Sequence, residues 1–342
     1  MTKARDLANL GNKTSLDEIN DAYDAGALSN RNILHNSEFR VNQRGVTSLT
    51  GITAGVSTFL ADRWITYVHG SDWNASIQEV TLPDGTITNS LKTVATANAT
   101  NGFFHPFQKV EAYGKDYLQG KKVVLSAWVR TNVAGQTMRI CDTVNCFFIG
   151  NFIPSDGDWH KIYAVYTFPT NMNTSVGGVI QFQPIFTPVN LATNDYCEFA
   201  LPQMELGSEP TPFEHRSYED ELAKCQRYYW EAVAPSQGTL GRMSYIASST
   251  SGLELLPMYP VPMRATPSVS LTNPTGGWQA YRFSGAGGGH SMQGALGGTN
   301  LSSFSGGHMW WDINSGTPFT VGFTGRVAAI SSSGAFKFDA EL

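Results

Sequence analysis

Hydrophobic and polar residues alternate along most of the chain between residues 32 and 215. Alternation with a period of two, combined with short runs of β-branched and aromatic residues, is typical of strands that bury one face. Seven segments show it: ADRWITYVHG (61–70), SIQEVTLPDG (76–85), KVVLSAWVRT (122–131), MRICDTVNCFFIGNF (138–152), HKIYAVYTF (160–168), VGGVIQFQPIF (176–186) and DYCEFALPQMEL (195–206).

Turn signals separate these segments. PDGT (83–86), SDGD (155–158), the asparagines at 171 and 173 and the pair Asn194-Asp195 favour tight turns. Closely spaced strands joined by short turns favour an antiparallel β-sandwich over alternating strands and helices. We therefore expect an all-β fold, with a first sandwich domain over residues 32–215.

Residues 1–31 have a different pattern. Ser15 followed by Glu18 is a capping-box signature, which predicts a short helix. The apolar positions of this segment are too few for a core of its own: Leu7, Leu10, Leu16, Ile19 and Tyr23. Such a segment becomes ordered when it docks on a larger body, so it is either an attachment segment or a frayed terminus.

The segment RSYEDELAKCQRYYWEAV, residues 216–233, is predicted to be helical. Ser217 is placed to cap it, acidic residues 219–221 favour its N-terminal dipole, and Leu222, Cys225, Tyr228 and Tyr229 form an apolar stripe. We interpret residues 216–234 as a linker helix. Strand patterns return after it, interrupted by a glycine-rich stretch at 276–307, and predict a second, smaller β-sandwich domain over residues 235–342.

Composition and charge narrow the possible partners. Charged residues make up 15% of the chain and the net charge is −5, without a run of lysine or arginine. A surface that follows nucleic-acid phosphates is therefore not expected. We expect no membrane insertion, because no apolar stretch approaches the roughly 18 residues of a span, and synthesis in a cytoplasm, because the first residues lack a signal-peptide pattern.

The four cysteines are Cys141, Cys146, Cys197 and Cys225. Cys141 and Cys146 are close enough in sequence to bridge across a hairpin. Cytoplasmic folding favours thiols, so we expect buried thiols ahead of a disulfide or a metal site.

Three parts of the chain resemble a known family. NILHNSEFRVNQRG (32–45) with ADRW (61–64) resembles the opening of carbohydrate-binding-module-like domains in bacteriophage and prophage tail proteins. EFALPQMELGSEPTPFEHRSYEDELAKCQRYYW (198–230) resembles their closing strand and following helix, and PVPMRATPSV (260–269) resembles the start of their distal β domain. The resemblance implies a jelly-roll first domain in a virion tail protein, usually a homotrimer, which attaches to tail or baseplate proteins by its N-terminus and contacts the host at its distal end.

Three tryptophans of the first domain lie in or beside apolar strands: Trp64, Trp128 and Trp159. We expect core packing between the two sheets, with each indole N–H donating to a backbone partner, rather than stacking on a sugar.

The distal domain combines aromatic and polar side chains in glycine-rich surroundings. Binding of a sugar needs an exposed ring for its C–H face and a few polar groups for its hydroxyls. The candidate glycan-binding residues are Trp278, Tyr281, His290, His308, Trp310, Trp311, Asp312 and Asn314. Trp310 and Trp311 are adjacent and point to opposite faces of a strand, so one of them is available for a glycan or for a neighbouring subunit.

Motifs for other chemistry are missing. The carboxylates Asp156 and Asp158 flank a turn glycine and favour a turn rather than a catalytic pair. No phosphate-binding glycine motif, nucleophile elbow or metal-ligand spacing occurs, so we expect no enzyme activity, no cofactor and no metal. The leading hypothesis is a phage tail fibre subunit that binds a host cell-surface polysaccharide through residues 235–342. The alternatives are a structural baseplate or tail adaptor and, less favoured, a glycan depolymerase.

Overall fold

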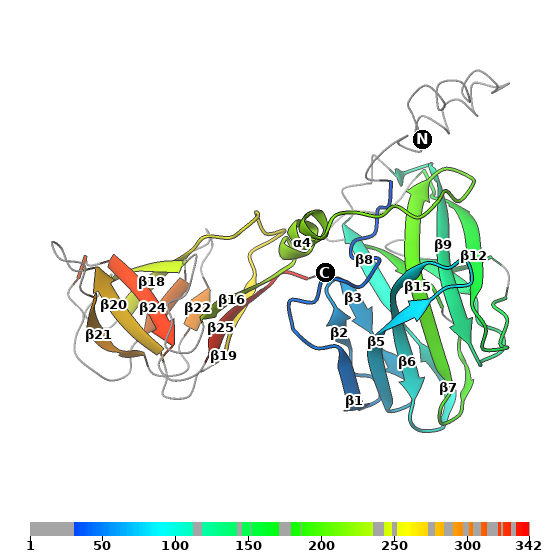
Figure 1. The fold of residues 1–342 in the computed structure, drawn as a ribbon, viewed down its shortest axis with the longest axis horizontal. Coiled ribbons are helices and arrows are strands. Elements are labelled where there is room, and N and C mark those ends of the chain that lie inside the picture. The colour runs from blue at the N-terminus through cyan, green and yellow to red at the C-terminus, as the bar shows by residue number, and fades with distance from the viewer. Residues whose placement is uncertain are drawn as a thin grey trace, which may run out of the picture. The chain divides into compact units, whose positions relative to one another are not determined.

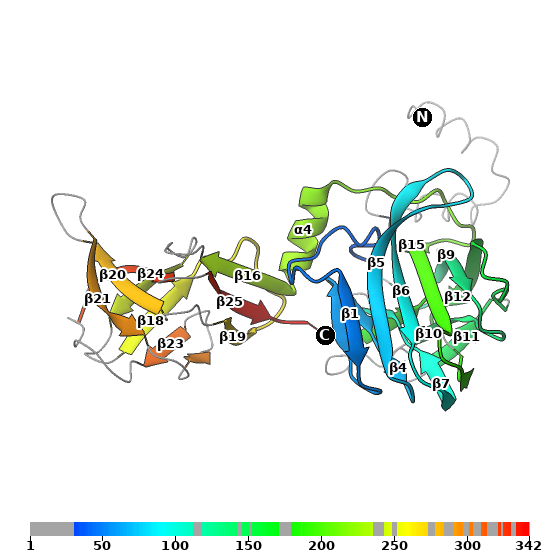
Figure 2. The same cartoon turned by 60° about the horizontal axis from the view of Figure 1, so that its bottom comes forward.

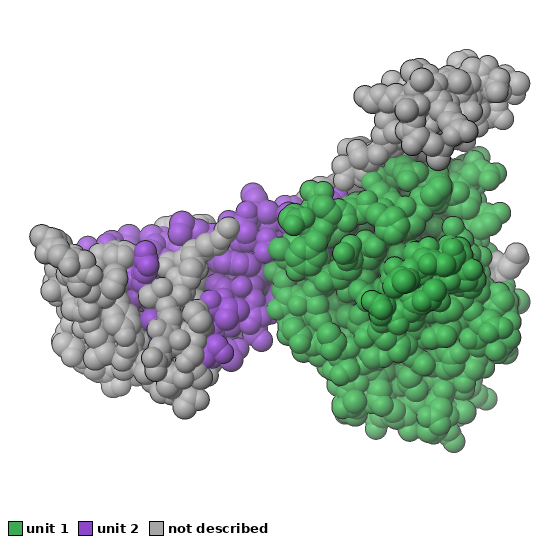
Figure 3. All heavy atoms as spheres, viewed as in Figure 1, with its two compact units in different colours: residues 1–222, 342 green, residues 223–341 purple. Residues whose placement is uncertain are grey.

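The computed structural model describes most of the chain after residue 30. The described residues are 31–111, 118–141, 146–150, 152–170, 179–185, 187–234, 243–247, 252–272, 278–283, 290–296, 301–303, 309–312, 321–322, 324–329 and 333–341. The chain divides into two compact units, residues 1–222 with 342 and residues 223–341, which Figure 3 shows in different colours.

Unit 1 consists of antiparallel strands, as the alternation predicts. They are β1 (Ser48–Ile52), β2 (Thr58–Ala61), β3 (Trp64–Thr66), β4 (Val68–His69), β5 (Trp73–Thr81), β6 (Ile87–Ala95), β7 (Ala99–Phe104), β8 (Phe107–Glu111), β9 (Lys122–Thr131), β10 (Met138–Cys141), β11 (Cys146–Ile149), β12 (His160–Thr167), β13 (Val179–Gln183), β14 (Val189–Leu191) and β15 (Tyr196–Leu206) (Figure 1).

Two six-stranded sheets enclose the core of unit 1. The first sheet has the order β1-β5-β6-β15-β9-β12 and can be followed in Figure 2, and the second has the order β11-β10-β13-β8-β3-β2. A third sheet has the order β14-β7-β4. Buried apolar residues from both large sheets form one cluster. Unit 1 is thus a β-sandwich.

Trp64 lies in this core, as expected. Its ring centroid is 5.6 Å from that of Phe39 and 5.3 Å from that of Phe199. The indole Nε1 donates to the backbone oxygens of His35 and Asn36, at 3.2 and 3.1 Å. The N–H is satisfied while the ring remains in an apolar environment.

The expected burial between the sheets is wrong for the other two tryptophans. Strand β9 directs Ala127 and Val129 into the core, so Trp128 between them faces outward and is half-buried. Trp159 is also half-buried, and both indoles pack on a separate small cluster around Ala200 and Leu201. A period of two identifies residues that share a face, but it does not say which face is covered.

Unit 2 is also built from antiparallel strands. They are β16 (Tyr229–Ala234), β17 (Met243–Ala247), β18 (Gly252–Pro257), β19 (Ser268–Thr272), β20 (Trp278–Phe283), β21 (His290–Leu296), β22 (Leu301–Ser303), β23 (Met309–Asp312), β24 (Thr324–Ala329) and β25 (Gly334–Asp339). They form a three-stranded sheet, β16-β25-β19, and a seven-stranded sheet, β21-β20-β24-β17-β18-β23-β22. Residues of both sheets contribute to the second core.

The predicted helix is shorter than expected. Helix α4 runs from Tyr218 to Gln226, and the Ser217 hydroxyl accepts the Asp220 N–H at 3.1 Å, as the cap prediction requires. The sequence-based prediction of a helix is wrong for residues 229–233. They lie in β16, where Trp230 and Ala232 are buried on one side. Among the described residues no helix is long and apolar enough to cross a bilayer.

The expectation that the cysteines are thiols is wrong for Cys141. Cys141 is disulfide-bonded, and strand pairing places Cys146 directly opposite it. Opposed residues of antiparallel strands lie within the Cα separation that a disulfide spans. Cys197 and Cys225 are buried and not disulfide-bonded, as expected.

Candidate functional site: an aromatic stripe on unit 1

Aromatic side chains form a continuous row on the outside of unit 1. From β3 into β4, Trp64, Thr66 and Val68 are fully buried, so the alternation turns Tyr67 and His69 outward. From β7 into β8, burial of Phe104 turns Phe103 and His105 outward in the same way.

Strand pairing joins these two series. Val68 is opposite Phe104 and His69 is opposite Phe103, while the His105 N–H donates to the Tyr67 oxygen at 2.8 Å. We call Tyr67, His69, Phe103, His105 and Phe107 the aromatic stripe.

The rings of the stripe contact one another in sequence. His69 stacks on Phe103 with ring centroids 4.7 Å apart and an interplanar angle of 3°. Tyr67 lies 6.1 Å from Phe103 and 5.7 Å from His105, and His105 lies 4.4 Å from Phe107. Tyr67, Phe103 and His105 are half-buried and His69 is exposed, so these four rings present surface outside the core, whereas Phe107 is buried at the inner end of the stripe.

His105 is the polar centre of the stripe. Its Nε2 is hydrogen-bonded to the side-chain amide of Gln183. Burial, followed by the nearby cations of Arg139 and Lys109, lowers the pKa of His105 to about 3. The imidazole is therefore neutral at neutral pH and acts as a hydrogen-bonding group without a charge.

Polar side chains of the second sheet flank the rings. The register sets Arg139 opposite Gln183, and the Lys109 ammonium is 6.0 Å from the Phe107 ring centroid. Rings that stack on C–H faces, beside imidazole and cationic groups that bind hydroxyls, are the two requirements of a sugar site.

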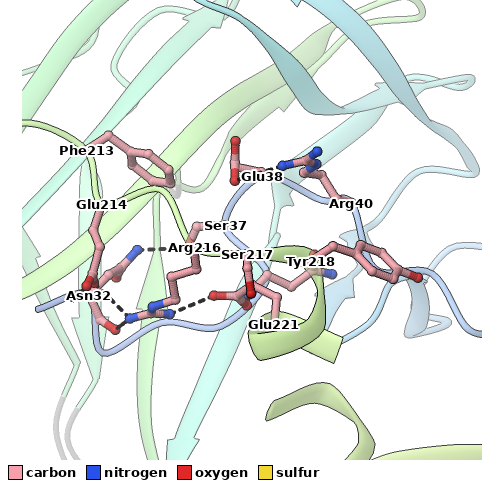
Figure 4. Close-up of a pocket in the computed structure, with 11 residues that line it drawn as sticks. Asn32, Ser37, Glu38, Arg40, Phe213, Glu214, Arg216, Ser217, Tyr218 and Glu221 are labelled. Atoms are coloured by element: carbon pink, nitrogen blue, oxygen red, sulfur yellow. Dashed lines mark hydrogen bonds and ion pairs between the residues drawn. The ribbon is translucent and has the colours of Figure 1, made fainter. Parts of the chain in front are cut away.

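A small hollow in unit 1 lies where residues 32–40 meet residues 213–221 (Figure 4). Arg216, whose side chain is 7% exposed, pairs with Glu214 at 3.0 Å and Glu221 at 2.8 Å and also donates to the oxygens of Asn32 and Leu34. The Asn32 N–H donates to Glu214 Oε2 at 2.7 Å. We name this network of Arg216, Glu214, Glu221 and Asn32 the Arg216 latch. Its ion pairs and hydrogen bonds join the segment at residues 32–34 to the segment at residues 214–221.

The candidate residues of the distal domain have a different placement. Trp278 is 0% exposed and packs on Phe336 at 5.2 Å in the core of unit 2, so its ring is not available to a glycan. For five others the structure describes the backbone position: Tyr281 is opposite Met292 and Arg326, His290 opposite Phe283, Trp310 opposite Glu254, Trp311 opposite Leu253, and Asp312 opposite Gly252.

The candidate glycan-binding residues of the distal domain also lie on strands that are not neighbours in the sheet. Strands β24, β17 and β18 separate β20, with Trp278 and Tyr281, from β23, with Trp310, Trp311 and Asp312. His308, Asn314 and the attachment residues Leu7, Leu10, Leu16, Ile19 and Tyr23 lie outside the described residues.

The aromatic stripe was not predicted from the sequence, although aromatic residues at alternate positions mark one of its two strands. FFHPFQKVE carries Phe103, His105 and Phe107 at alternate positions. Pro106 between them weakens a strand prediction, because proline cannot donate to a sheet ladder. The partner series, Tyr67 and His69, is recognisable only from the pairing of β4 with β7.

The turn predicted at residues 155–158 is present. Asp156 accepts the Asp158 N–H at 2.9 Å around Gly157, which confirms the turn. In the described part of the chain no group of three or more histidine, cysteine, aspartate or glutamate side chains is arranged to hold a metal ion.

No family model and no curated protein matches the sequence. Among solved structures, the enzymatically active domain of tailspike protein 4 from bacteriophage CBA120 is 11% identical with a TM-score of 0.33, over 52% of this chain and 21% of that chain. The CBM22-1 xylan-binding domain from Paenibacillus barcinonensis Xyn10C is 11% identical with a TM-score of 0.30, over 52% and 96%.

The tandem CBM22-1–CBM22-2 domain of the same protein is 10% identical with a TM-score of 0.28, over 86% and 99%. The match to the tailspike domain covers about a fifth of the matched tailspike chain. The chain is similar to carbohydrate-binding-module-like β-sandwich domains.

Proposed function

We propose that the chain is a glycan-binding protein without catalytic activity, and that unit 1 binds the sugar on the aromatic stripe. The observation that carries this proposal is the contact of four partly exposed rings, Tyr67, His69, Phe103 and His105, the last of them neutral and hydrogen-bonded to the buried Gln183. The strands of a packed sandwich hold these rings, so little side-chain entropy remains to be lost on binding.

In this proposal the chain is a tail fibre subunit of a phage virion, made in the host cytoplasm and assembled as a homotrimer. Residues 1–31 dock on other tail proteins, and the bound glycan belongs to the host cell surface. The sequence resemblance at residues 32–45, 198–230 and 260–269 supports this placement. Three subunits convert a weak single site into firm attachment through avidity.

Binding of the full chain to an array of immobilised bacterial surface polysaccharides tests the proposal. Phe103 contacts Tyr67, His69 and His105, so Phe103→Ala is expected to weaken binding by about 1–2 kcal/mol, or roughly tenfold. Phe152→Ala is the matched control, because Phe152 is 72% exposed and contacts no ring of the stripe.

Three results would contradict the proposal: no binding to any glycan, equal binding by Phe103→Ala and wild type, or release of reducing ends from a bound polysaccharide. Thermal unfolding of each variant separates a lost contact from a lost fold.

A further inference from the structure

Outward-facing aromatic residues also gather on the first sheet of unit 1. Trp128 and Arg130 face outward from β9. Trp159 comes one residue before His160, which is opposite Val129, so the backbone places Trp159 beside Arg130. Tyr196, half-buried at the start of the neighbouring strand β15, completes the group. We call Trp128, Trp159 and Tyr196 the outer aromatic face; the strands that carry it can be followed in Figure 2.

A buried carboxylate organises this face. Glu198 is 0% exposed and accepts hydrogen bonds from Gln78 Nε2 at 2.9 Å and Ser90 Oγ at 2.6 Å. Arg130 donates to Glu198 Oε2 through Nε and through a terminal nitrogen, both at 2.8 Å. Apolar replacements of a buried ion pair are often at least as stable, so stability alone does not explain this network.

Cations fix two of the rings. The Arg130 guanidinium carbon lies 4.7 Å from the Trp159 ring centroid, and the Lys92 ammonium lies 4.5 Å from the Tyr196 ring centroid. Such cation–π contacts restrict the orientation of the two rings. Trp128, Trp159 and Tyr196 all keep part of their surface exposed.

Polar groups border the rings on the same side of the sheet. Pairing of β5 with β6 and of β6 with β15 aligns Gln78 with Ser90, and Ser76 with Lys92 and Glu198. Ring surface beside hydroxyl, amide and ammonium groups suits a carbohydrate better than the apolar centre of a protein interface.

We infer that the outer aromatic face is a second glycan-binding surface of unit 1, independent of the aromatic stripe and centred on Trp159 and Trp128. The inference takes its ligand class from the proposed function, and different residues on different strands carry it. One unit then engages two sugars of one polysaccharide or of two neighbouring chains.

Four forms of the full chain test it on the polysaccharide array: wild type, Phe103→Ala, Trp159→Ala and the double variant. Each single variant is expected to lose roughly tenfold in apparent affinity for dense glycan and to keep residual binding, because bivalent attachment becomes monovalent. The double variant is expected to lose binding completely. The single variant Trp159→Phe keeps an aromatic ring beside Arg130 and is expected to retain most of the wild-type affinity.

The outcomes separate the two proposals. Binding by Trp159→Ala that equals wild type, or residual binding by the double variant that equals Phe103→Ala, overturns the second surface and leaves the stripe standing. Wild-type binding by Phe103→Ala together with a loss in Trp159→Ala overturns the stripe and supports the outer face. Loss of subunit association in Trp159→Ala without a change in glycan binding makes the face a protein interface and overturns the inference. Phe152→Ala again serves as the exposed aromatic control.

Discussion

The surroundings of His105 determine the protonation state of its imidazole. Its ring lies between Tyr67, Phe103 and Phe107, and Gln183 binds its Nε2. Burial and the cations of Arg139 and Lys109 all disfavour the charged ring. In the proposed glycan site the imidazole therefore stays a neutral hydrogen-bonding group across the physiological pH range.

The lowered pKa of His105 predicts a pH-dependent stability. Between pH 6.5 and about 3 the unfolded chain binds a proton at this residue that the folded chain does not. The free energy of unfolding therefore falls as the pH falls, by up to about 1.4 kcal/mol per pH unit. Urea unfolding at pH 7 and pH 5 should show a decrease about 2 kcal/mol larger in wild type than in His105→Gln. Equal decreases would contradict the assigned pKa.

At the scale of elements, the Arg216 latch joins the segment that enters the sandwich to the segment that leaves it. Arg31 donates to Thr211 Oγ1 at 2.7 Å, the Asn36 N–H donates to Glu221, and the Ile33 N–H donates to the Met204 oxygen at 2.8 Å. Segments about 180 residues apart in sequence are thus held side by side, and Figure 4 shows Arg216 between its two carboxylates.

Arg216→Gln is expected to lower the free energy of unfolding of unit 1 by about 3 kcal/mol, because it leaves two largely buried carboxylates without their cation. Arg40→Gln is the matched control. The Arg40 side chain is 53% exposed and pairs with Glu38 at 3.7 Å, so its loss should cost less than about 0.5 kcal/mol. Similar urea midpoints for the two variants would show that the latch does not stabilise the unit.

For the whole molecule, each unit has a core of its own. The cluster around Trp64 and Phe199 contains residues of unit 1, and the cluster around Trp278 and Phe336 contains residues of unit 2. Separate cores permit separate cooperative unfolding transitions.

Calorimetry of the full chain is expected to show two transitions. Trp278→Ala removes a fully buried indole and should destabilise one unit by about 3–5 kcal/mol, while Phe199→Ala should affect the other by a similar amount. A shift of both transitions by either variant would contradict independent cores.

Part of the candidate sites follows from strand pattern and part from strand pairing. The alternation in WITYVH predicts that Tyr67 and His69 share a face, and the segment FFHPF does the same for Phe103 and His105. That the two pairs meet depends on β4 lying beside β7, a contact between segments more than thirty residues apart. For the same reason the outer aromatic face, with residues from β9, β15 and the turn before β12, was not predicted.

The antiparallel β character, the SDGD turn, the cap at Ser217 and the burial of Trp64 follow from the amino-acid sequence alone, because they depend on local geometry and on hydrophobic periodicity. Four features depend on the packing of distant segments: Trp128 and Trp159 face outward, Trp278 is buried, α4 ends at Gln226, and Cys141 is disulfide-bonded. Periodicity tells which residues share a face, whereas only the packing of distant strands determines which face is covered and which side chains meet.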